Sequence, residues 1–282
     1  ISQIKELLSY LPQNCRPEEK PPRVINSDSP QRTSDRLLEI VGGGSRSPYD
    51  MHQILKEIVD NGKFFEIHKD FAKSMIVGFA RLDGYSVGII ANNPLHMAGA
   101  ITTKAAEKAA RFIRFCDAFN IPVIFVVSTP AYLVGSQQEK EGMIYRGASL
   151  LYAVSEATVP KITVIVGKAF AGAYIAMGSK YLRADVVYAW PSAEIGLVAA
   201  EGTVNVIYRK EIAAAANAAE ERKKREEQFR NTYMSVYYPA SYQHIDNIID
   251  PAQTRPILIN TLEALQNKKQ ELPKRKHGNM PL

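Results

Sequence analysis

Two apolar runs, residues 123–127 and 162–166, the second with Thr163 as its one polar residue, constrain the fold of this 282-residue chain more than any other feature. Each run is short and rich in Val and Ile, and a segment with helical periodicity follows it along the chain. A strand that is apolar at every position must be covered on both faces, which is typical of parallel strands joined by crossover helices. The sequence therefore predicts an α/β fold around a sheet that is buried on both sides.

The flanking sequence predicts further elements of this fold. Residues 76–82 and 85–91 are separated by Asp83 and Gly84, which is a strong signal for a hairpin with a two-residue turn. One apolar stripe on the helix expected at 104–119 should pack on the sheet, and it consists of Ala109, Phe112, Ile113 and Cys116. Other helices are expected at 51–60, at 140–157, from about 171, and from 250 to about 268.

The two ends of this pattern differ in composition from the middle. A short amphipathic helix is expected at 2–11, and residues 12–48 are rich in Pro, Ser, Asp, Arg and Gly, which suits a linker or strap. The interpretation is an N-terminal segment, residues 1–47, followed by one domain, residues 48–282. Residues 210–233 are charged and rich in Ala, Glu, Lys and Arg, and this predicts an exposed helix or a protruding helical hairpin.

Charge and composition argue against several classes of function. The net charge of +6 is spread over the chain, and its short basic runs at 223–225 and 274–276 lack the interleaved aromatic residues of a nucleic-acid platform. No apolar run approaches the roughly 18 residues of a membrane span. The five histidines form no HxxxH pair, so no metal site is expected. Cys15 and Cys116 cannot build a disulfide framework, which favours a reducing compartment, either the cytoplasm or the mitochondrial matrix.

The stretch 168–180 is the most informative for chemistry. Small residues at Ala171, Gly172 and Ala173 follow the second apolar strand at the start of a helix, where free backbone N–H groups and the positive end of the helix dipole converge. An oxygen atom can approach such N–H groups because no bulky side chain covers them, so one interpretation is an oxyanion hole. The alternative is that the small residues only allow the helix to pack closely on the sheet.

Several stretches in the same order resemble the C-terminal half of the carboxyltransferase subunit of propionyl-CoA carboxylase and related biotin-dependent acyl-CoA carboxylases. The resemblance covers about 49–282, and it is carried by residues 112–122, 147–153, 155–161, 188–195 and 276–282. It implies the crotonase or ClpP-like superfold of repeated ββα units. Residues 1–47 then resemble the connector between the two crotonase-like halves of that family.

The resemblance implies a reaction that uses no protein acid or base. In this family, carboxybiotin releases carbon dioxide, the ureido nitrogen of biotin takes the α-proton of the acyl-CoA, and the thioester enolate attacks the carbon dioxide. The catalytic residues carried over are Gly172 and Ala173, whose N–H groups hold the ureido oxygen. A preorganised pair of donors of this kind is worth about 3–4 kcal/mol of barrier.

The remaining site residues also follow from the resemblance. The biotin-binding loop is expected at Pro130, Ala131 and Tyr132, with two departures from the family pattern: Ser128 stands where Asp is usual and Ala131 where Gly is usual. The acyl pocket is expected at Tyr174 and Ile175, and the apolar Ile175 side chain favours an apolar acyl group.

Partners are implied as well. The sequence has no Ala-Met-Lys-Met biotinylation motif and no GxxxxGK(S/T) loop for ATP. Biotin is therefore expected on a separate biotin carboxyl carrier protein, and a biotin carboxylase is expected to load it. The acyl-CoA is the substrate, an N-terminal carboxyltransferase half completes the site, and a homo-oligomer built from dimers, up to a hexamer, is expected.

Three other functions compete with this interpretation. The α subunit of a sodium-pumping methylmalonyl-CoA or glutaconyl-CoA decarboxylase runs the same transfer in reverse, and a noncatalytic assembly half-subunit needs no reaction at all. An enoyl-CoA hydratase or isomerase is suggested by Glu194, but hydratases need a second carboxylate where this chain has Ile175. Glu194 is therefore expected to be a structural acceptor.

Overall fold

A single mixed sheet organises the computed structural model, which describes residues 1–16, 18–25, 27–42, 48–278 and 281. The strand order is β1-β2-β3-β4-β5-β6-β8, and β7 pairs separately with β5. The strands are β1 (Phe65–Ile67), β2 (Met75–Leu82), β3 (Tyr85–Asn92), β4 (Val123–Thr129), β5 (Lys161–Phe170), β6 (Val186–Ala189), β7 (Glu194–Gly196) and β8 (Asn247–Ile248).

The predicted hairpin is confirmed. β2 and β3 pair antiparallel with Leu82 opposite Tyr85, and Asp83 and Gly84 both have positive φ, 48° and 78°, as a two-residue type I′ turn requires. From β3 onward the central strands β4, β5 and β6 are parallel. Parallel pairing needs crossover connections, and the helices between these strands supply them.

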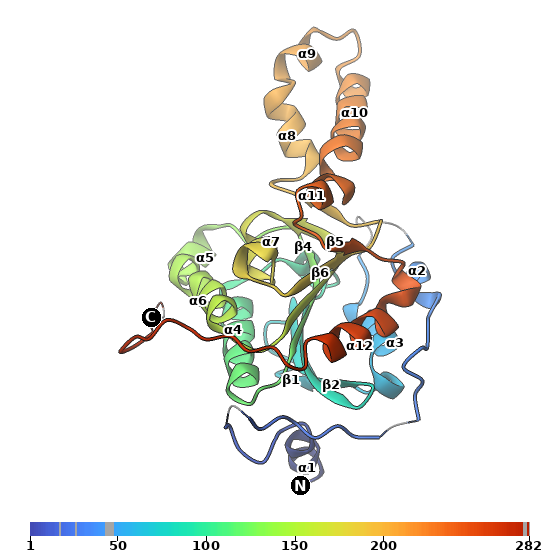
Figure 1. The fold of residues 1–282 in the computed structure, drawn as a ribbon. Helices are drawn as coiled ribbons and strands as arrows, with labels where there is room; N and C mark the ends of the chain where they lie inside the picture. The colour runs from blue at the N-terminus through green and yellow to red at the C-terminus, as the bar shows by residue number, and fades with distance from the viewer. Residues whose placement is uncertain (17, 26, 43–47, 279–280, 282) are drawn as a thin grey trace.

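The helices lie on both faces of the sheet (Figure 1). They are α1 (Ser2–Ser9), α2 (Arg36–Ile40), α3 (Met51–Ile58), α4 (Thr103–Ala118), α5 (Ser136–Lys140), α6 (Met143–Glu156), α7 (Ala171–Ala176), α8 (Ala200–Ile207), α9 (Arg209–Ala214), α10 (Ala218–Phe229), α11 (Tyr237–Ser241) and α12 (Thr254–Ala264), with short 3₁₀ or π turns η1 (Asp60–Gly62), η2 (Met97–Gly99), η3 (Lys180–Leu182), η4 (Arg230–Met234) and η5 (Pro251–Gln253).

The sheet is buried on both sides, as the apolar strands predicted. Phe125 of β4 points into a core with α4 and α6, to which Ile113 and Leu150 belong. The next residue of the strand, Val126, points into the opposite core, which α3 and α12 cover. The α/β prediction is therefore confirmed.

Several predicted helices differ from the structure at their ends. The helices expected at 2–11 and 51–60 end at Ser9 and Ile58. The helix expected at 140–157 is α6, which begins at Met143 because Gly142 adopts a left-handed conformation with φ 81° that separates it from the preceding α5. The last helix begins as predicted, with the Asp250 side chain accepting a hydrogen bond from the N–H of Ala252, but it ends at Ala264 rather than near 268.

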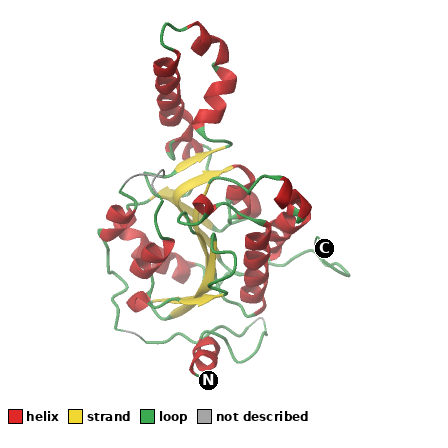
Figure 2. Cartoon of the chain, turned by 180° about the vertical axis from the view of Figure 1, so that it is seen from behind, coloured by secondary structure: helices red, strands yellow, loops and turns green. Residues whose placement is uncertain are grey.

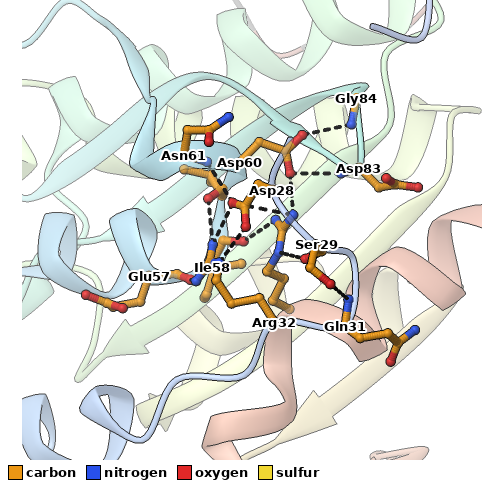
Figure 3. A network of polar contacts seen from close by, with 12 residues as sticks. Asp28, Ser29, Gln31, Arg32, Glu57, Ile58, Asp60, Asn61, Asp83 and Gly84 are labelled. Atoms are coloured by element: carbon orange, nitrogen blue, oxygen red, sulfur yellow. Dashed lines mark hydrogen bonds and ion pairs between the residues drawn. The ribbon is translucent and has the colours of Figure 1, made fainter. Parts of the chain in front are cut away.

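The N-terminal segment lies against the rest of the chain, and its side chains enter the core at Tyr10 and Leu37, each 1 % exposed. Figure 3 shows part of the polar network that holds it, with Asp28 and Arg32 of the segment beside Asp60. The buried Arg255 guanidinium belongs to the same network. Arg255 forms an ion pair with Asp60 at 2.6 Å and donates to the carbonyls of Ile58 at 2.9 Å and Ser29 at 3.3 Å. This network joins α12 to η1 and to the N-terminal segment.

Helices α8, α9 and α10 form a helical hairpin that projects from the body of the molecule (Figures 1 and 2). Asn217 caps α10 by accepting a hydrogen bond from the N–H of Glu220. No residue of α10 is buried, so the hairpin predicted for 210–233 is confirmed, and it begins earlier, with α8.

Two further observations bear on the classes of function considered above. None of the helices in the described part of the chain is both long and apolar enough to cross a membrane. Among the described residues, no group of three His, Cys, Asp or Glu side chains is placed to hold a metal ion.

Candidate functional site

The turn from β5 to α7 is the centre of the candidate site. β5 ends at Phe170, and Ala171, the first residue of α7, has a positive φ of 49°. A left-handed conformation is unusual for a residue with a Cβ atom and is concentrated at functional turns. The sharp turn lets the helix begin directly at the carboxyl end of the strand.

The first N–H groups of α7 are free of partners outside the helix. An α-helix leaves its first four N–H groups without an intrahelical acceptor. Among the described residues, no acceptor outside α7 binds the N–H of Gly172 or Ala173. Gly172 is exposed, whereas Ala173 is fully buried directly behind it. A ligand oxygen can therefore reach these donors only past Gly172.

The structure brings Tyr132 next to Gly172, although the two residues are far apart in the sequence. A Cβ atom at Gly172 would lie 3.8 Å from Cδ2 of the Tyr132 ring. The Tyr132 hydroxyl donates to the carbonyl of Gly147 at 3.3 Å, and burial raises the pKa of this hydroxyl. The ring is thereby fixed as a wall beside the turn.

The loop that carries Tyr132 is anchored through its backbone. The N–H of Ile101 donates to the carbonyl of Ala131 at 3.0 Å, and the N–H of Leu133 donates to the carbonyl of Ile101 at 2.9 Å. Pro130 is half-buried at the start of this loop. The predicted biotin loop is thus a fixed segment that places Tyr132, but not Pro130 or Ala131, in contact range of Gly172.

Ser128 is 4 % exposed. Its N–H donates to the side-chain oxygen of Asn92 at 3.3 Å, and the hydroxyl of Tyr49 lies nearby. Burial raises the pKa of Tyr49 to about 12, and the neighbouring Ser128 hydroxyl opposes this rise only in part. A neutral side chain suits this buried position.

A large cavity of about 1160 Å³ opens beside the turn, and Gly172, Tyr174 and Ile175 all line it. The two residues predicted for the acyl pocket therefore share one cavity with the predicted donor Gly172. The Tyr174 hydroxyl is buried without a hydrogen-bond partner among the described residues, and burial raises its pKa.

Part of the cavity lining is an aromatic wall that the sequence analysis did not identify, and it begins at Tyr181, whose ring contacts that of Tyr174. Tyr181 contacts the ring of His244 at a centroid distance of 4.9 Å, and the two side chains share a hydrogen bond of 3.2 Å. Tyr238 and Tyr242 continue this wall toward the helical hairpin. The signal available in the sequence was the density of Tyr between 233 and 242.

The acidic residues of the chain lie elsewhere than in the described lining of this cavity. None of the described residues that line it is Asp or Glu. Glu194 lies in β7 opposite Lys168 of β5, and it is its neighbour Ile195 that lines the cavity. A hydratase needs two carboxylates beside the reacting atoms, so this cavity does not have the chemistry of a hydratase.

These features define a class of site. The strand-to-helix turn at Ala171 and Gly172 borders a cavity that is mainly apolar and has no carboxylate among its described lining residues. Backbone N–H groups at such a turn can stabilise negative charge on a ligand oxygen.

Comparison with known proteins shows which family the chain belongs to. The model of the carboxyl transferase domain family matches residues 1–280, and the chain belongs to this family. It is 49 % identical over 282 residues to a propionyl-CoA carboxylase carboxyltransferase subunit of Haloferax mediterranei, covering 100 % of this chain and 54 % of the relative. It is 44 % identical to the α subunit of a methylmalonyl-CoA decarboxylase of Veillonella parvula, covering 100 % of this chain and 53 % of the relative.

A solved structure agrees with these relatives. The transcarboxylase 12S structure, described as a hexamer assembly with methylmalonyl-coenzyme A bound, superposes with a TM-score of 0.94 at 44 % identity, covering 100 % of this chain and 54 % of that one. The fold is therefore the crotonase-like superfold of the carboxyltransferases, as the resemblance implied. The chain spans about half the length of the relatives it matches.

Proposed function

We propose that this chain is the biotin-facing, C-terminal half of a carboxyltransferase that moves a carboxyl group between carboxybiotin and an acyl-CoA of the propionyl-CoA type. The observation that carries the proposal is the turn at Ala171, which places Gly172 at the edge of a cavity with no carboxylate among its described lining residues. Relatives that are 44 to 49 % identical over the whole chain support it.

The residues at the turn fit biotin. Gly172 is exposed, Tyr132 lies beside it, and the cavity walls are mainly apolar, which suits a bicyclic ring with one polar edge. When bound, carboxybiotin supplies the carboxyl group, and negative charge develops on its ureido oxygen. The N–H groups of Gly172 and Ala173 stabilise that charge, and the loop 130–132 holds the ring.

The acyl pocket is proposed at Tyr174 and Ile175. Ile175 presents an apolar surface within the same cavity as Gly172, so it excludes water beside the acyl chain and favours apolar acyl groups. The neutral Tyr174 hydroxyl adds no charge to this wall.

The proposed partners follow from the half-length match. A biotin carboxyl carrier protein brings biotin, a biotin carboxylase loads it, and an N-terminal carboxyltransferase half completes the acyl-CoA site. We further propose that the protein assembles through dimers into a hexamer. The chain is divided in this proposal into an N-terminal segment, residues 1–47, and a carboxyltransferase domain, residues 48–282. Its proposed location is a reducing compartment, either the cytoplasm or the mitochondrial matrix. Support for the compartment comes from two free cysteines, Cys15 and Cys116.

A second candidate is the α subunit of a biotin-dependent acyl-CoA decarboxylase, favoured by the Veillonella parvula relative. The two candidates share the site and differ in the direction of transfer. A noncatalytic assembly half-subunit is the third.

The test reconstitutes the reaction. The chain is mixed with the N-terminal half of the Haloferax mediterranei relative, a carboxylated biotin carrier protein and propionyl-CoA, and carboxylated acyl-CoA is measured by chromatography. Product should form only when both halves are present. If the two halves co-elute and are folded but make no product in either direction, the noncatalytic alternative holds.

A further inference from the structure

A second cavity, of about 990 Å³, lies along helices α4 and α6, and we call it the basic groove. Its walls come from Lys108, Arg111 and Arg114 on α4 and from Tyr145 and Arg146 on α6. It shares no lining residue with the cavity beside Gly172 among the described residues, and none of its lining residues has been assigned a role in the proposed carboxyl transfer.

Positive charge predominates in the basic groove. Four of the side chains that line it are cationic, and Glu107 is the one carboxylate among the described lining residues. Glu107 forms an ion pair with Arg146, and Arg114 lies 3.7 Å from Glu156. Arg111 is exposed and forms no ion pair with any described residue. The groove therefore has positive charge to offer an anion.

The base of the groove holds a buried ammonium group. Lys108 is 4 % exposed, and it donates to the carbonyls of Phe71 and Met75, both at 2.7 Å. An ammonium group has three N–H donors, and among the described residues the third has no acceptor. Burial lowers the pKa of Lys108 to about 8, so it still carries its charge at pH 7.

Aromatic side chains stand at the rim of the groove. Phe71 is 44 % and Tyr145 is 42 % exposed, and the Arg146 guanidinium lies 5.3 Å from the Tyr145 ring. Exposed rings beside arginines are suited to stacking a flat aromatic group. The volume is that of a small-molecule site rather than of a protein interface.

We propose that the basic groove binds an organic phosphate that carries an aromatic base, with the phosphates on Lys108, Arg111, Arg114 and Arg146 and the base against Phe71 or Tyr145. Arginine and lysine bind phosphate oxygens by charge-assisted hydrogen bonds, which are the stronger class of hydrogen bond. Two kinds of ligand carry both phosphates and an aromatic base: a free nucleoside diphosphate and the nucleotide end of coenzyme A.

Isothermal titration calorimetry tests the proposal with ADP, coenzyme A, inorganic pyrophosphate and adenosine at low ionic strength. ADP or coenzyme A should bind with a stoichiometry of one, and both pyrophosphate and adenosine should bind more weakly. The more tightly bound of the first two identifies the kind of ligand. The triple variant R111Q/R114Q/R146Q should weaken this binding at least about tenfold, because three charge-assisted contacts are lost.

The control removes the same charge elsewhere. Arg222, Lys223 and Lys224 are exposed on α10, and the variant R222Q/K223Q/K224Q should bind like the parent chain. The proposal is overturned if neither ADP nor coenzyme A binds, if the control loses as much affinity as the groove variant, or if pyrophosphate binds as tightly as ADP. Circular dichroism confirms that both variants are folded.

Discussion

Replacing Arg255 with Met should destabilise the whole chain, because its guanidinium is buried and pairs with Asp60, a residue of the network in Figure 3. Its side chain is 2 % exposed and that of its partner Asp60 is 5 % exposed. Methionine fills much of the same space but provides no charge and no donors. The substitution removes the Arg255 ion pair from the Asp60 carboxylate and the Arg255 donor from the carbonyl of Ile58. The carbonyl of Ser29 keeps the N–H of Arg32 as a donor at 3.1 Å.

The size of the expected loss of unfolding free energy depends on the hydrogen bonds that Asp60 keeps in the variant. Removing one partner of a buried ion pair costs about 3–5 kcal/mol. Asp60 still accepts hydrogen bonds from the N–H groups of Asp83 at 2.9 Å and Gly84 at 2.8 Å, so its charge keeps part of its solvation. We therefore expect a loss near the lower end of that range, about 3 kcal/mol of unfolding free energy.

Urea unfolding followed by circular dichroism measures this loss. Arg23→Met is the matched control, because Arg23 pairs with Asp83 in an exposed contact, and such pairs are worth about 0–1 kcal/mol. Adding Asp60→Asn to Arg255→Met should recover part of the stability by removing a buried charge that has lost its ion pair with Arg255. An Arg255→Met variant that loses no more than the Arg23 control would refute the role assigned to the network.

Three further predictions concern the acyl pocket, the exposed surface and the response to acid. Ile175→Asp should slow transfer to longer acyl-CoAs more than to acetyl-CoA, because a charge beside an apolar chain costs at least about 1–3 kcal/mol; equal losses across chain lengths in the reconstituted assay would exclude the contact. The chain alone should bind a hydrophobic dye and self-associate at micromolar concentration, because Leu197, Val206 and Tyr242 are 78 %, 77 % and 61 % exposed; a strictly monomeric species in light scattering that binds no dye would contradict this. Burial alone would raise the pKa of Asp28, but hydrogen bonds from Arg32 and from the backbone, together with nearby positive charges, lower it below its ordinary value of 3.8. Asp28 therefore stabilises the fold above that pH, and this contribution is lost as the pH falls through the lowered pKa. Asp28→Asn should flatten the profile of unfolding free energy in urea against pH below pH 4, relative to the parent chain.

The parts of the fold that were predictable depend on local patterns. The turn at Asp83 and Gly84 and the apolar stripe on α4 follow from spacing within a few residues. The end of α5 at Gly142 is also local, but a glycine inside a helical pattern is common enough that it does not by itself predict a break.

The candidate site was predictable only in part. Gly172 and Ile175 lie on one short helix, so a motif at that helix was sufficient to place them in one cavity. The aromatic wall at Tyr181 and His244 depends on how η3 meets the segment after α11, and the Arg255 network joins residues more than 190 positions apart in sequence. No local pattern encodes such contacts, because they arise only when the sheet brings distant segments together.

The central claim, that the backbone donors at the start of α7 stabilise charge on the biotin ureido oxygen, is tested most directly by the rate at which the chain decarboxylates free carboxybiotin. Ala173→Pro removes one donor, because proline has no N–H. Ala173→Val is the matched control, because it adds bulk at the same buried position and keeps the donor. With both variants folded by circular dichroism, the account predicts that the proline variant is slower by about a hundred- to a thousandfold while the valine variant retains most of the parent rate. A proline variant that decarboxylates carboxybiotin as fast as the valine variant would contradict it.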